Sequence, residues 1–340
     1  MKKILVLCLM IFLITGCGKK NDNVVNVLNW SSYIPDEVIH EFEKETGIKV
    51  NYSTYSSNEE LLAKVTSVKK GTYDLVFPSD YMVEIMKSKK LLTKLDRTKL
   101  GNINNLDINF LGKDYDKDNE YSLPFLAAMV LIAYDSSVIK DEITGYNDLL
   151  NPKYKENIVL LDDQRTMIGI ALLALGYDIN ETESNKLNEA KNFLLKLKDN
   201  IKLFDSDSPK NFLISDEVDI GVIWNAEIAL AMNENKDIKV VYPKEGAIIS
   251  LDNYVILNGA QNEDNAYKLI DYLLRADVMK KIIESYPYTN VNGMTKYYLD
   301  ESYLHNKAAN VDYEVIKKAS FVGNIGKMVK RFDEIWAEIK

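Results

Sequence analysis

The sequence predicts an α/β protein made of two lobes, each a mostly parallel sheet flanked by helices. Strand patterns alternate with helix patterns along the chain, and this order is typical of α/β units with parallel strands. The part that follows the leader is long enough for two lobes of ordinary domain size. No internal repeat or Pro/Gly-rich linker interrupts it, so we expect the chain to cross between the lobes through extended segments.

The first half of the chain begins with a strand and a well-marked helix. A short apolar strand at 24–28 precedes a helix near 35–47. Pro35 and two acids occupy the start of this helix, and Gly47 follows its end, as expected for helix termini. Alternation and apolar spacing then predict strands at 48–55 and 73–79, and helices at 58–69 and 81–89.

The second half repeats the same pattern. Apolar runs predict strands at 157–163, 218–224, 238–243 and 253–257. Amphipathic spacing predicts helices at 165–175, 186–197, 226–232, 263–274 and 277–284. In largely parallel sheets, ligands bind beyond the carboxyl ends of the strands, so those ends are where functional residues are expected.

Residues 1–16 predict a secretory signal peptide. Lys2 and Lys3 precede an apolar run at 4–14 that is too short for a membrane-spanning helix. The residues that end at Cys17 resemble a bacterial lipobox, which implies that Cys17 is lipidated and becomes the first mature residue. Residues 17–23 then form a polar tether suited to a membrane-anchored domain. The alternative is an ordinary signal peptide with a chance cysteine.

Composition excludes several kinds of site. The only other cysteine, Cys8, leaves with the leader, so the folded part has no thiolate site, and His40 and His305 are too few for a histidine-based metal site. We therefore expect no metal and no cofactor. Removal of the leader takes the net charge from −9 to −11, the opposite sign to that of a nucleic-acid-binding protein.

Aromatic and acidic side chains gather at the predicted strand boundaries, although a turn does not need large aromatic residues. Each of these clusters has a simpler explanation. Ser79 or Asp163 could cap a helix, and Trp30 or Trp224 could belong to the core. Together, however, rings and carboxylates at one edge of two lobes suit an organic cation. The clusters are Trp30-Ser31-Ser32-Tyr33, Pro78-Ser79-Asp80-Tyr81, Asp162-Asp163, Trp224-Asn225-Ala226-Glu227 and Ser250-Leu251-Asp252.

Several segments resemble the bacterial spermidine/putrescine-binding proteins of ABC importers. They include LNWSSYIP, YDLVFPSDY, LLDDQR, GVIWN and VVYPKEGAI, in order along nearly the whole mature chain. The resemblance implies a type II periplasmic-binding-protein fold with a polyamine in the cleft between its lobes, no catalysis, and delivery to permease subunits. It also implies a monomer at the extracytoplasmic face of the cell membrane, or in the periplasm. Its lobe boundaries are 24–127 with 253–298, and 128–252 with 299–340.

The family's ligand positions transfer to this chain residue by residue. Trp30 and Tyr33 resemble walls of an aromatic box around the methylene chain of a polyamine, and Asp252 resembles its principal ammonium partner. The full set of candidate ligand residues is Trp30, Ser31, Ser32, Tyr33, Ser79, Tyr81, Asp163, Thr166, Trp224, Glu227, Asp252 and Tyr288.

The chain departs from the family at specific positions. The family usually has an acid where Ser32 and Thr166 stand. Glu227 follows the putrescine-binding members, whereas Asp163 follows the spermidine-binding ones. The choice between the two polyamines therefore stays open at the level of the sequence.

Two alternatives use other residues. Paired tyrosines hold ferric iron in related folds, and Tyr297-Tyr298 is such a pair, although it lies beyond the matched positions. Asp162-Asp163 could be paired carboxylates of a hydrolytic enzyme, but adjacent residues usually point in different directions. The sequence also lacks a nucleophile elbow and a phosphate-binding glycine loop. We therefore expect a binding protein and not an enzyme.

Overall fold

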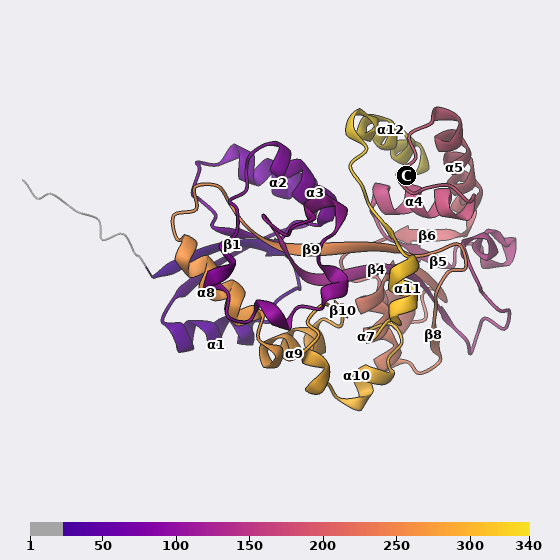
Figure 1. Ribbon diagram of the computed structural model, residues 1–340. Coiled ribbons are helices and arrows are strands. Elements are labelled where there is room, and N and C mark those ends of the chain that lie inside the picture. Colours follow the sequence, from indigo (N-terminus) through magenta and orange to yellow (C-terminus); the bar gives the residue numbers. More distant parts are fainter. Residues whose placement is uncertain (1–22) are drawn as a thin grey trace, which may run out of the picture.

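The computed structural model describes residues 23–340 and has the expected α/β fold. The strands are hydrogen-bonded in the order β2-β1-β3-β9-β4-β7-β5-β6, and helices cover the sheet (Figure 1). The leader, Cys17 and most of the tether lie outside the described residues. None of the helices described in 23–340 is long and apolar enough to cross a bilayer.

The first end of the sheet is parallel. β1 (Val24–Trp30) lies between β2 (Lys49–Tyr55) and β3 (Leu75–Val76) and pairs with both in the parallel sense. The left part of Figure 1 shows this end with its helices α1 (Asp36–Thr46), α2 (Asn58–Ser67), α3 (Asp80–Ser88), α8 (Glu263–Leu273) and α9 (Ala276–Ser285).

Local signals explain where two of these helices begin and end. α1 follows Pro35, carries Asp36 and Glu37 in its first turn, and stops at Gly47, which adopts a left-handed conformation with φ of 70°. The Ser57 hydroxyl accepts a hydrogen bond from the backbone N–H of Glu60 and so caps α2.

The second end of the sheet repeats the parallel arrangement. β5 (Ile158–Leu160) lies between β6 (Ile201–Phe204) and β7 (Ile220–Trp224). The strand β6 was not predicted from the sequence. The helices that pack here are α4 (Gln164–Ala174), α5 (Ser184–Leu197), α6 (Lys210–Ile214), α7 (Asn225–Glu234) and α12 (Val329–Ile339).

Two long antiparallel strands join the ends. β4 (Leu123–Asp135) pairs with β9 (Ile248–Ile256), and Figure 1 shows both running between the two ends. β4 was not predicted, because all of its residues except the half-buried Tyr134 are buried, and they lack the alternation of a half-buried strand. β9 begins at Ile248, five residues before the predicted start, so the prediction that Asp252 precedes a strand was wrong.

Smaller elements complete the second end and the chain terminus. β8 (Ile238–Val241) and β10 (Thr289–Asn290) pair with β4, and β11 (Ser320–Phe321) pairs with β9. The short helices α10 (Glu301–His305) and α11 (Tyr313–Lys318) lie in the segment that leads to α12. The sheet as a whole is therefore mixed, since β9 runs antiparallel to β3 and β4, and β4 runs antiparallel to β7.

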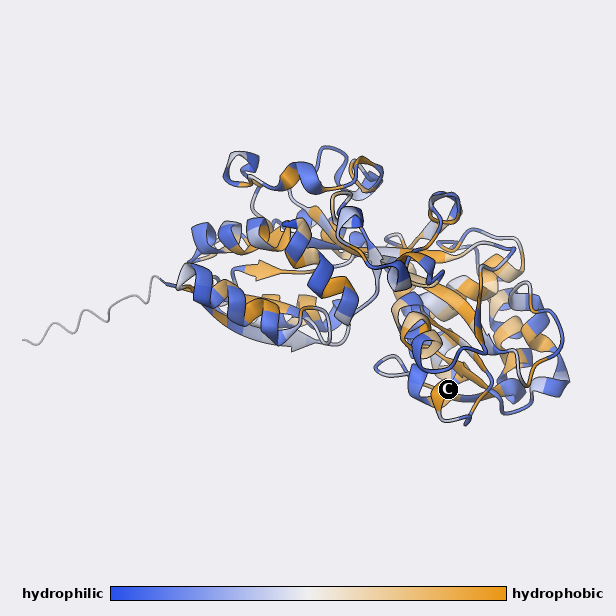
Figure 2. Ribbon diagram, turned by 90° about the horizontal axis from the view of Figure 1, so that it is seen from below, coloured by the Kyte–Doolittle hydropathy of each residue, from blue (hydrophilic) through white to orange (hydrophobic). Residues whose placement is uncertain are grey.

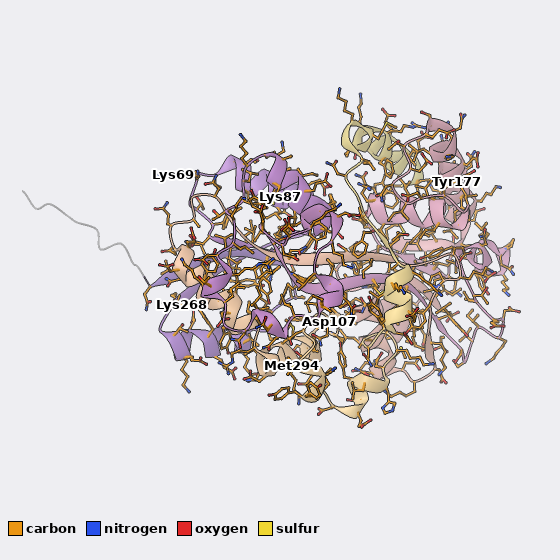
Figure 3. The ribbon with its side chains drawn as sticks, viewed as in Figure 1. Lys69, Lys87, Asp107, Tyr177, Lys268 and Met294 are labelled. Carbon is orange, nitrogen blue, oxygen red and sulfur yellow. The ribbon has the colours of Figure 1, made fainter. Side chains whose placement is uncertain are left out.

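Apolar side chains of both ends belong to one buried cluster, and a smaller cluster lies under α2 and α3. Figure 2 shows the strands largely orange and the outward faces of the helices largely blue. Charged side chains such as Lys69 and Lys268 lie on the outer surface (Figure 3). The polar groups that are buried, among them Asp80 and Asp252, are the exceptions that need an explanation.

Candidate functional site

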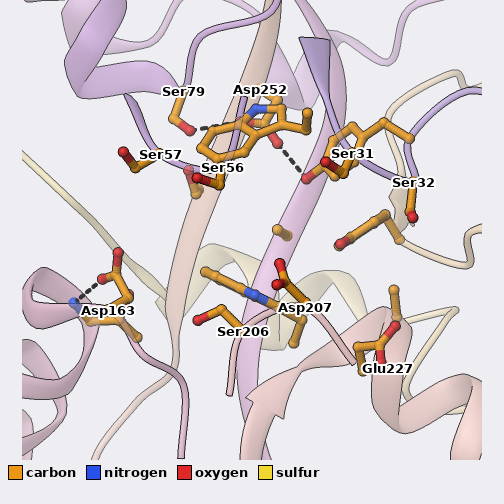
Figure 4. Close-up of a pocket in the computed structure, with 18 of the residues that line it drawn as sticks. Ser31, Ser32, Ser56, Ser57, Ser79, Asp163, Ser206, Asp207, Glu227 and Asp252 are labelled. Carbon is orange, nitrogen blue, oxygen red and sulfur yellow. Dashed lines mark hydrogen bonds between the residues drawn. The ribbon is translucent and has the colours of Figure 1, made fainter. Parts of the chain in front are cut away.

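A cavity of about 460 Å³ lies at the carboxyl ends of β1, β5 and β7, the edge at which α/β sheets bind ligands. Residues from both ends of the sheet contribute to it, and the close-up in Figure 4 shows part of its lining. All twelve predicted ligand residues line this one cavity: Trp30, Ser31, Ser32, Tyr33, Ser79, Tyr81, Asp163, Thr166, Trp224, Glu227, Asp252 and Tyr288. The first and last of these residues, Trp30 and Tyr288, are 258 positions apart in the sequence.

Asp252 is a buried carboxylate on one wall, with only neutral hydrogen-bond donors. The Tyr33 hydroxyl donates to its Oδ2 at 2.7 Å, and the Ser79 hydroxyl donates to its Oδ1 at 2.7 Å. The residue is only 2 % exposed. Burial raises the pKa of Asp252 to about 6, and the two hydroxyl hydrogen bonds act in the opposite direction. Among the described residues, no lysine or arginine forms an ion pair with it.

A second buried carboxyl lies directly behind this wall. Asp80 begins α3 and accepts hydrogen bonds from the backbone N–H groups of Tyr81, at 2.8 Å, and Leu251, at 3.2 Å. Burial raises the pKa of Asp80 to about 8, and the nearby Asp252 contributes to this increase. Sequence analysis placed Asp80 in a strand-end cluster but did not select it, and Asp80 does not line the cavity.

Aromatic rings surround Asp252. The Tyr33 ring lies 4.8 Å from that of Tyr288 and 6.3 Å from that of Trp30, measured between centroids. Trp30 also contacts Tyr55 at 4.5 Å, and its indole N–H donates to the Phe77 carbonyl at 3.0 Å. These contacts hold the rings in position, and the rings offer faces suited to an alkyl chain or a cation.

Ser31 and Ser32 are exposed at the rim next to these rings. Ser32 adopts a left-handed backbone conformation with φ of 53°, which is uncommon for a residue other than glycine. This conformation turns the chain sharply after β1, between Trp30 at the end of the strand and Tyr33. The turn explains why two aromatic residues so close in sequence can face the same cavity.

Asp163 has two roles. Its Oδ1 accepts a hydrogen bond from the backbone N–H of Thr166 at 2.7 Å, so it caps α4 as the simpler explanation proposed. It also lines the cavity, on the side opposite Glu227 in the view of Figure 4. Thr166 is itself buried in the first turn of α4 and lines the cavity with a hydroxyl in place of an acid.

Glu227 is already bound by a cation of the protein. The Lys210 Nζ lies 2.9 Å from Oε2 and 3.2 Å from Oε1 of Glu227. Lys210 begins α6 and Glu227 lies in the first turn of α7, so packing of two helices creates the pair. Sequence analysis missed Lys210, because nothing in the segment SDSPKNF distinguishes this lysine from a surface lysine.

A buried arginine was also missed. Arg165 lines the cavity from α4 and donates to the Gly323 carbonyl at 2.9 Å and to the Asn180 side chain at 3.1 Å. Its guanidinium lies 5.9 Å from the centroid of the Tyr81 ring, which comes from the other end of the sheet. Burial lowers the pKa of Arg165. The motif LLDDQR contained this residue, but arginine has no obvious place in a site for a cation.

The residues of the two alternative sites are arranged differently. Asp162 forms an ion pair with Lys340, whereas Asp163 caps α4, so the two carboxylates have separate partners. Tyr297 and Tyr298 are exposed and do not line the cavity. Within residues 23–340 there is no cluster of three or more His, Cys, Asp or Glu side chains arranged to hold a metal ion.

Comparison with known proteins identifies the family. The family model described as "Bacterial extracellular solute-binding protein" matches residues 37–309. This chain belongs to that family. Members of the family bind solutes, and this protein is accordingly an extracellular or periplasmic binding protein and not an enzyme, as expected from the sequence.

Individual relatives agree with this assignment. The spermidine/putrescine-binding periplasmic protein of Escherichia coli is 37% identical over 321 residues, which cover 94% of this chain and 92% of that protein. A solved structure described as a "Putative spermidine/putrescine ABC transporter" from Listeria monocytogenes has a TM-score of 0.88 at 32% identity, over 93% of this chain and 98% of that one.

A further solved structure, the Tp0655 lipoprotein of Treponema pallidum, supports the fold alone. It has a TM-score of 0.86 at 23% identity, over 93% of this chain and 99% of that chain. The fold seen in Figure 1 is therefore the fold of solved proteins of this class.

Proposed function

We propose that this protein captures spermidine or putrescine outside the cytoplasm and delivers it to the permease subunits of an ABC importer. Two kinds of observation support the proposal. Relatives named for these polyamines align with almost the whole chain. The cavity, in addition, has the chemistry that a flexible organic dication requires, with carboxylates for its ends and rings for its methylene groups.

The observation that carries the proposal is the environment of Asp252. A carboxylate buried without a counter-ion is unfavourable, and burial raises the pKa of Asp252 for this reason. Two hydroxyl donors orient the carboxylate, but they do not neutralise it. A ligand ammonium group placed against Asp252 would supply the missing charge, and the adjacent rings of Trp30 and Tyr288 would cover the ligand's alkyl chain.

Isothermal titration with putrescine, cadaverine, spermidine and spermine tests the function. We expect saturable binding of at least one of putrescine and spermidine at one site per chain. γ-Aminobutyrate serves as a control of similar length, because its carboxylate would face the acids of the cavity. Absence of binding by all four polyamines would contradict the proposal.

We propose further that the two ends of the sheet act as lobes that close on the ligand. In this proposal the lobes are 24–127 with 253–298, and 128–252 with 299–340. Two observations support it: the cavity is lined from both ends of the sheet, and β4 and β9 connect them. Closure around small ligands is common in proteins of this architecture. Small-angle X-ray scattering should show a smaller radius of gyration with saturating putrescine, and an unchanged curve would contradict closure.

We also propose that Cys17 carries a lipid and anchors the protein to the outer face of the cell membrane. The lipobox-like sequence before Cys17 and the polar tether at 17–23 support this. Cys17→Ala should move the protein from the membrane fraction to the soluble or secreted fraction. Unchanged membrane association of this variant would contradict the anchor.

A further inference from the structure

The ion pair between Lys210 and Glu227 places an ammonium group of the protein inside the cavity. The side chains are 23 % and 13 % exposed, and both residues line the cavity. The Lys210 Nζ contacts both carboxylate oxygens of Glu227, at 2.9 and 3.2 Å. A primary ammonium on a flexible methylene chain is also the chemical group at the end of a polyamine. Lys210 therefore occupies this carboxylate as a ligand ammonium would.

The other acids of the cavity are either buried or half-buried without an ion pair, or exposed to solvent. Asp252 and Asp163 accept hydrogen bonds from neutral groups, and neither forms an ion pair within the described chain, although Asp163 interacts electrostatically with the nearby Arg165. Asp162 is bound by Lys340. Glu59 and Asp207 are exposed, and the Tyr81 hydroxyl donates to Glu59. Because exposed carboxylates contribute little to ion pairing, Asp252 and Asp163 are the two that remain for a ligand.

We propose that Lys210 is a specificity-determining residue that makes the cavity selective for a diamine over a triamine. This inference rests on the proposed polyamine-binding function. Glu227 lies on the side of the cavity opposite Asp163, with Asp252 on the facing wall (Figure 4). A ligand with two ammonium groups can pair with Asp252 and Asp163. A third ammonium directed toward Glu227 meets Lys210, and it must either displace that lysine or stay uncompensated.

The test compares spermidine with putrescine in four forms of the purified protein. Lys210→Met removes the ammonium, keeps most of the side-chain volume, and frees Glu227. Lys210→Met with Glu227→Gln removes both charges of the pair. Lys202→Met is the matched control, because it also removes one lysine paired to a glutamate in the same part of the molecule, outside the cavity. Isothermal titration gives both dissociation constants for each form, and thermal unfolding shows that each variant is folded.

We expect Lys210→Met to improve the affinity for spermidine relative to putrescine by about tenfold or more, the effect of one additional charge pair. The double variant should return this ratio to that of the parent, and Lys202→Met should leave it unchanged. If the ratio of the two dissociation constants in Lys210→Met stays within about twofold of that in the parent, the inference is wrong. The same holds if both ligands bind more tightly by an equal factor. Either result leaves the proposed function itself intact. If the parent binds neither polyamine, the proposed function fails and the inference fails with it.

Discussion

Asp252 and Glu227 are carboxylates on the same cavity with opposite surroundings. Asp252 is almost fully buried, receives hydrogen bonds from two hydroxyl groups and has no cationic partner among the described residues. Glu227 is more exposed and is already paired with Lys210. The charge of a buried carboxylate with neutral donors is not compensated by the protein, whereas the charge of a carboxylate paired with its own lysine is. The two acids therefore present different surroundings to an ammonium group that enters the cavity.

The largest expected effect is that of Asp252→Asn. The variant keeps the size of the side chain, and the hydroxyls of Tyr33 and Ser79 can rotate to accept as well as donate, so the fold should persist. Polyamine binding should weaken by about 2–5 kcal/mol, because one ligand ammonium loses its buried partner. Isothermal titration measures the loss.

Asp207→Asn is the matched control for this variant. It makes the same chemical change at an exposed acid of the same cavity, and the affinity should stay within about threefold of the parent. If Asp252→Asn binds putrescine as tightly as Asp207→Asn does, the buried carboxylate is not the ligand's partner, and the contrast between Asp252 and Glu227 loses its functional meaning.

The next effect is a dependence of affinity on pH. In the free protein, burial raises the pKa of Asp252 to about 6. A bound ammonium favours the ionised carboxylate and must lower this pKa, so binding releases a proton whenever Asp252 starts protonated. Through Asp252 alone, the affinity should be nearly constant well above pH 6 and fall by up to about tenfold per pH unit below it.

Asp80 adds to this effect at higher pH. Its pKa is raised to about 8 in the free protein, and a cation bound near Asp252 should lower it as well. Titrations at pH 7 in two buffers with different ionisation enthalpies should report proton release on binding. An affinity that does not change between pH 5 and 8, with no proton release, would show that neither carboxyl senses the ligand.

The smallest expected effect is that of Tyr33→Phe. This variant removes one hydroxyl donor from Asp252 and keeps the ring that faces Tyr288. Because that hydrogen bond lowers the pKa of Asp252, its loss should move the pH at which binding declines to a higher value. At pH 8 the affinity should change by about 1 kcal/mol or less. A decline that begins at a lower pH than in the parent would contradict the role assigned to the hydroxyl.

Most of the local elements could be predicted from the sequence, because strand alternation, helix periodicity and helix-terminal residues are properties of neighbouring residues. α1 follows Pro35 and ends at Gly47 as expected. β4 could not be recognised in the same way, since a strand buried on both faces shows no alternation, and the extension of β9 back to Ile248 depends on its pairing with β4. These two failures concern the strands that join the ends of the sheet, and the short strand β6 was missed as well.

For the site, the sequence alone determined which residue types stand at the strand boundaries, and all twelve candidates line one cavity. The contacts that each of them makes there depend on the fold. Asp252 and Tyr33 are 219 residues apart, and Glu227 and Lys210 come from different helices. Charge compensation depends on distances of about 3 Å between side chains, whereas the sequence pattern records only what each residue is. Hence the sequence identified the acids, and the fold determined which of them keep an uncompensated charge.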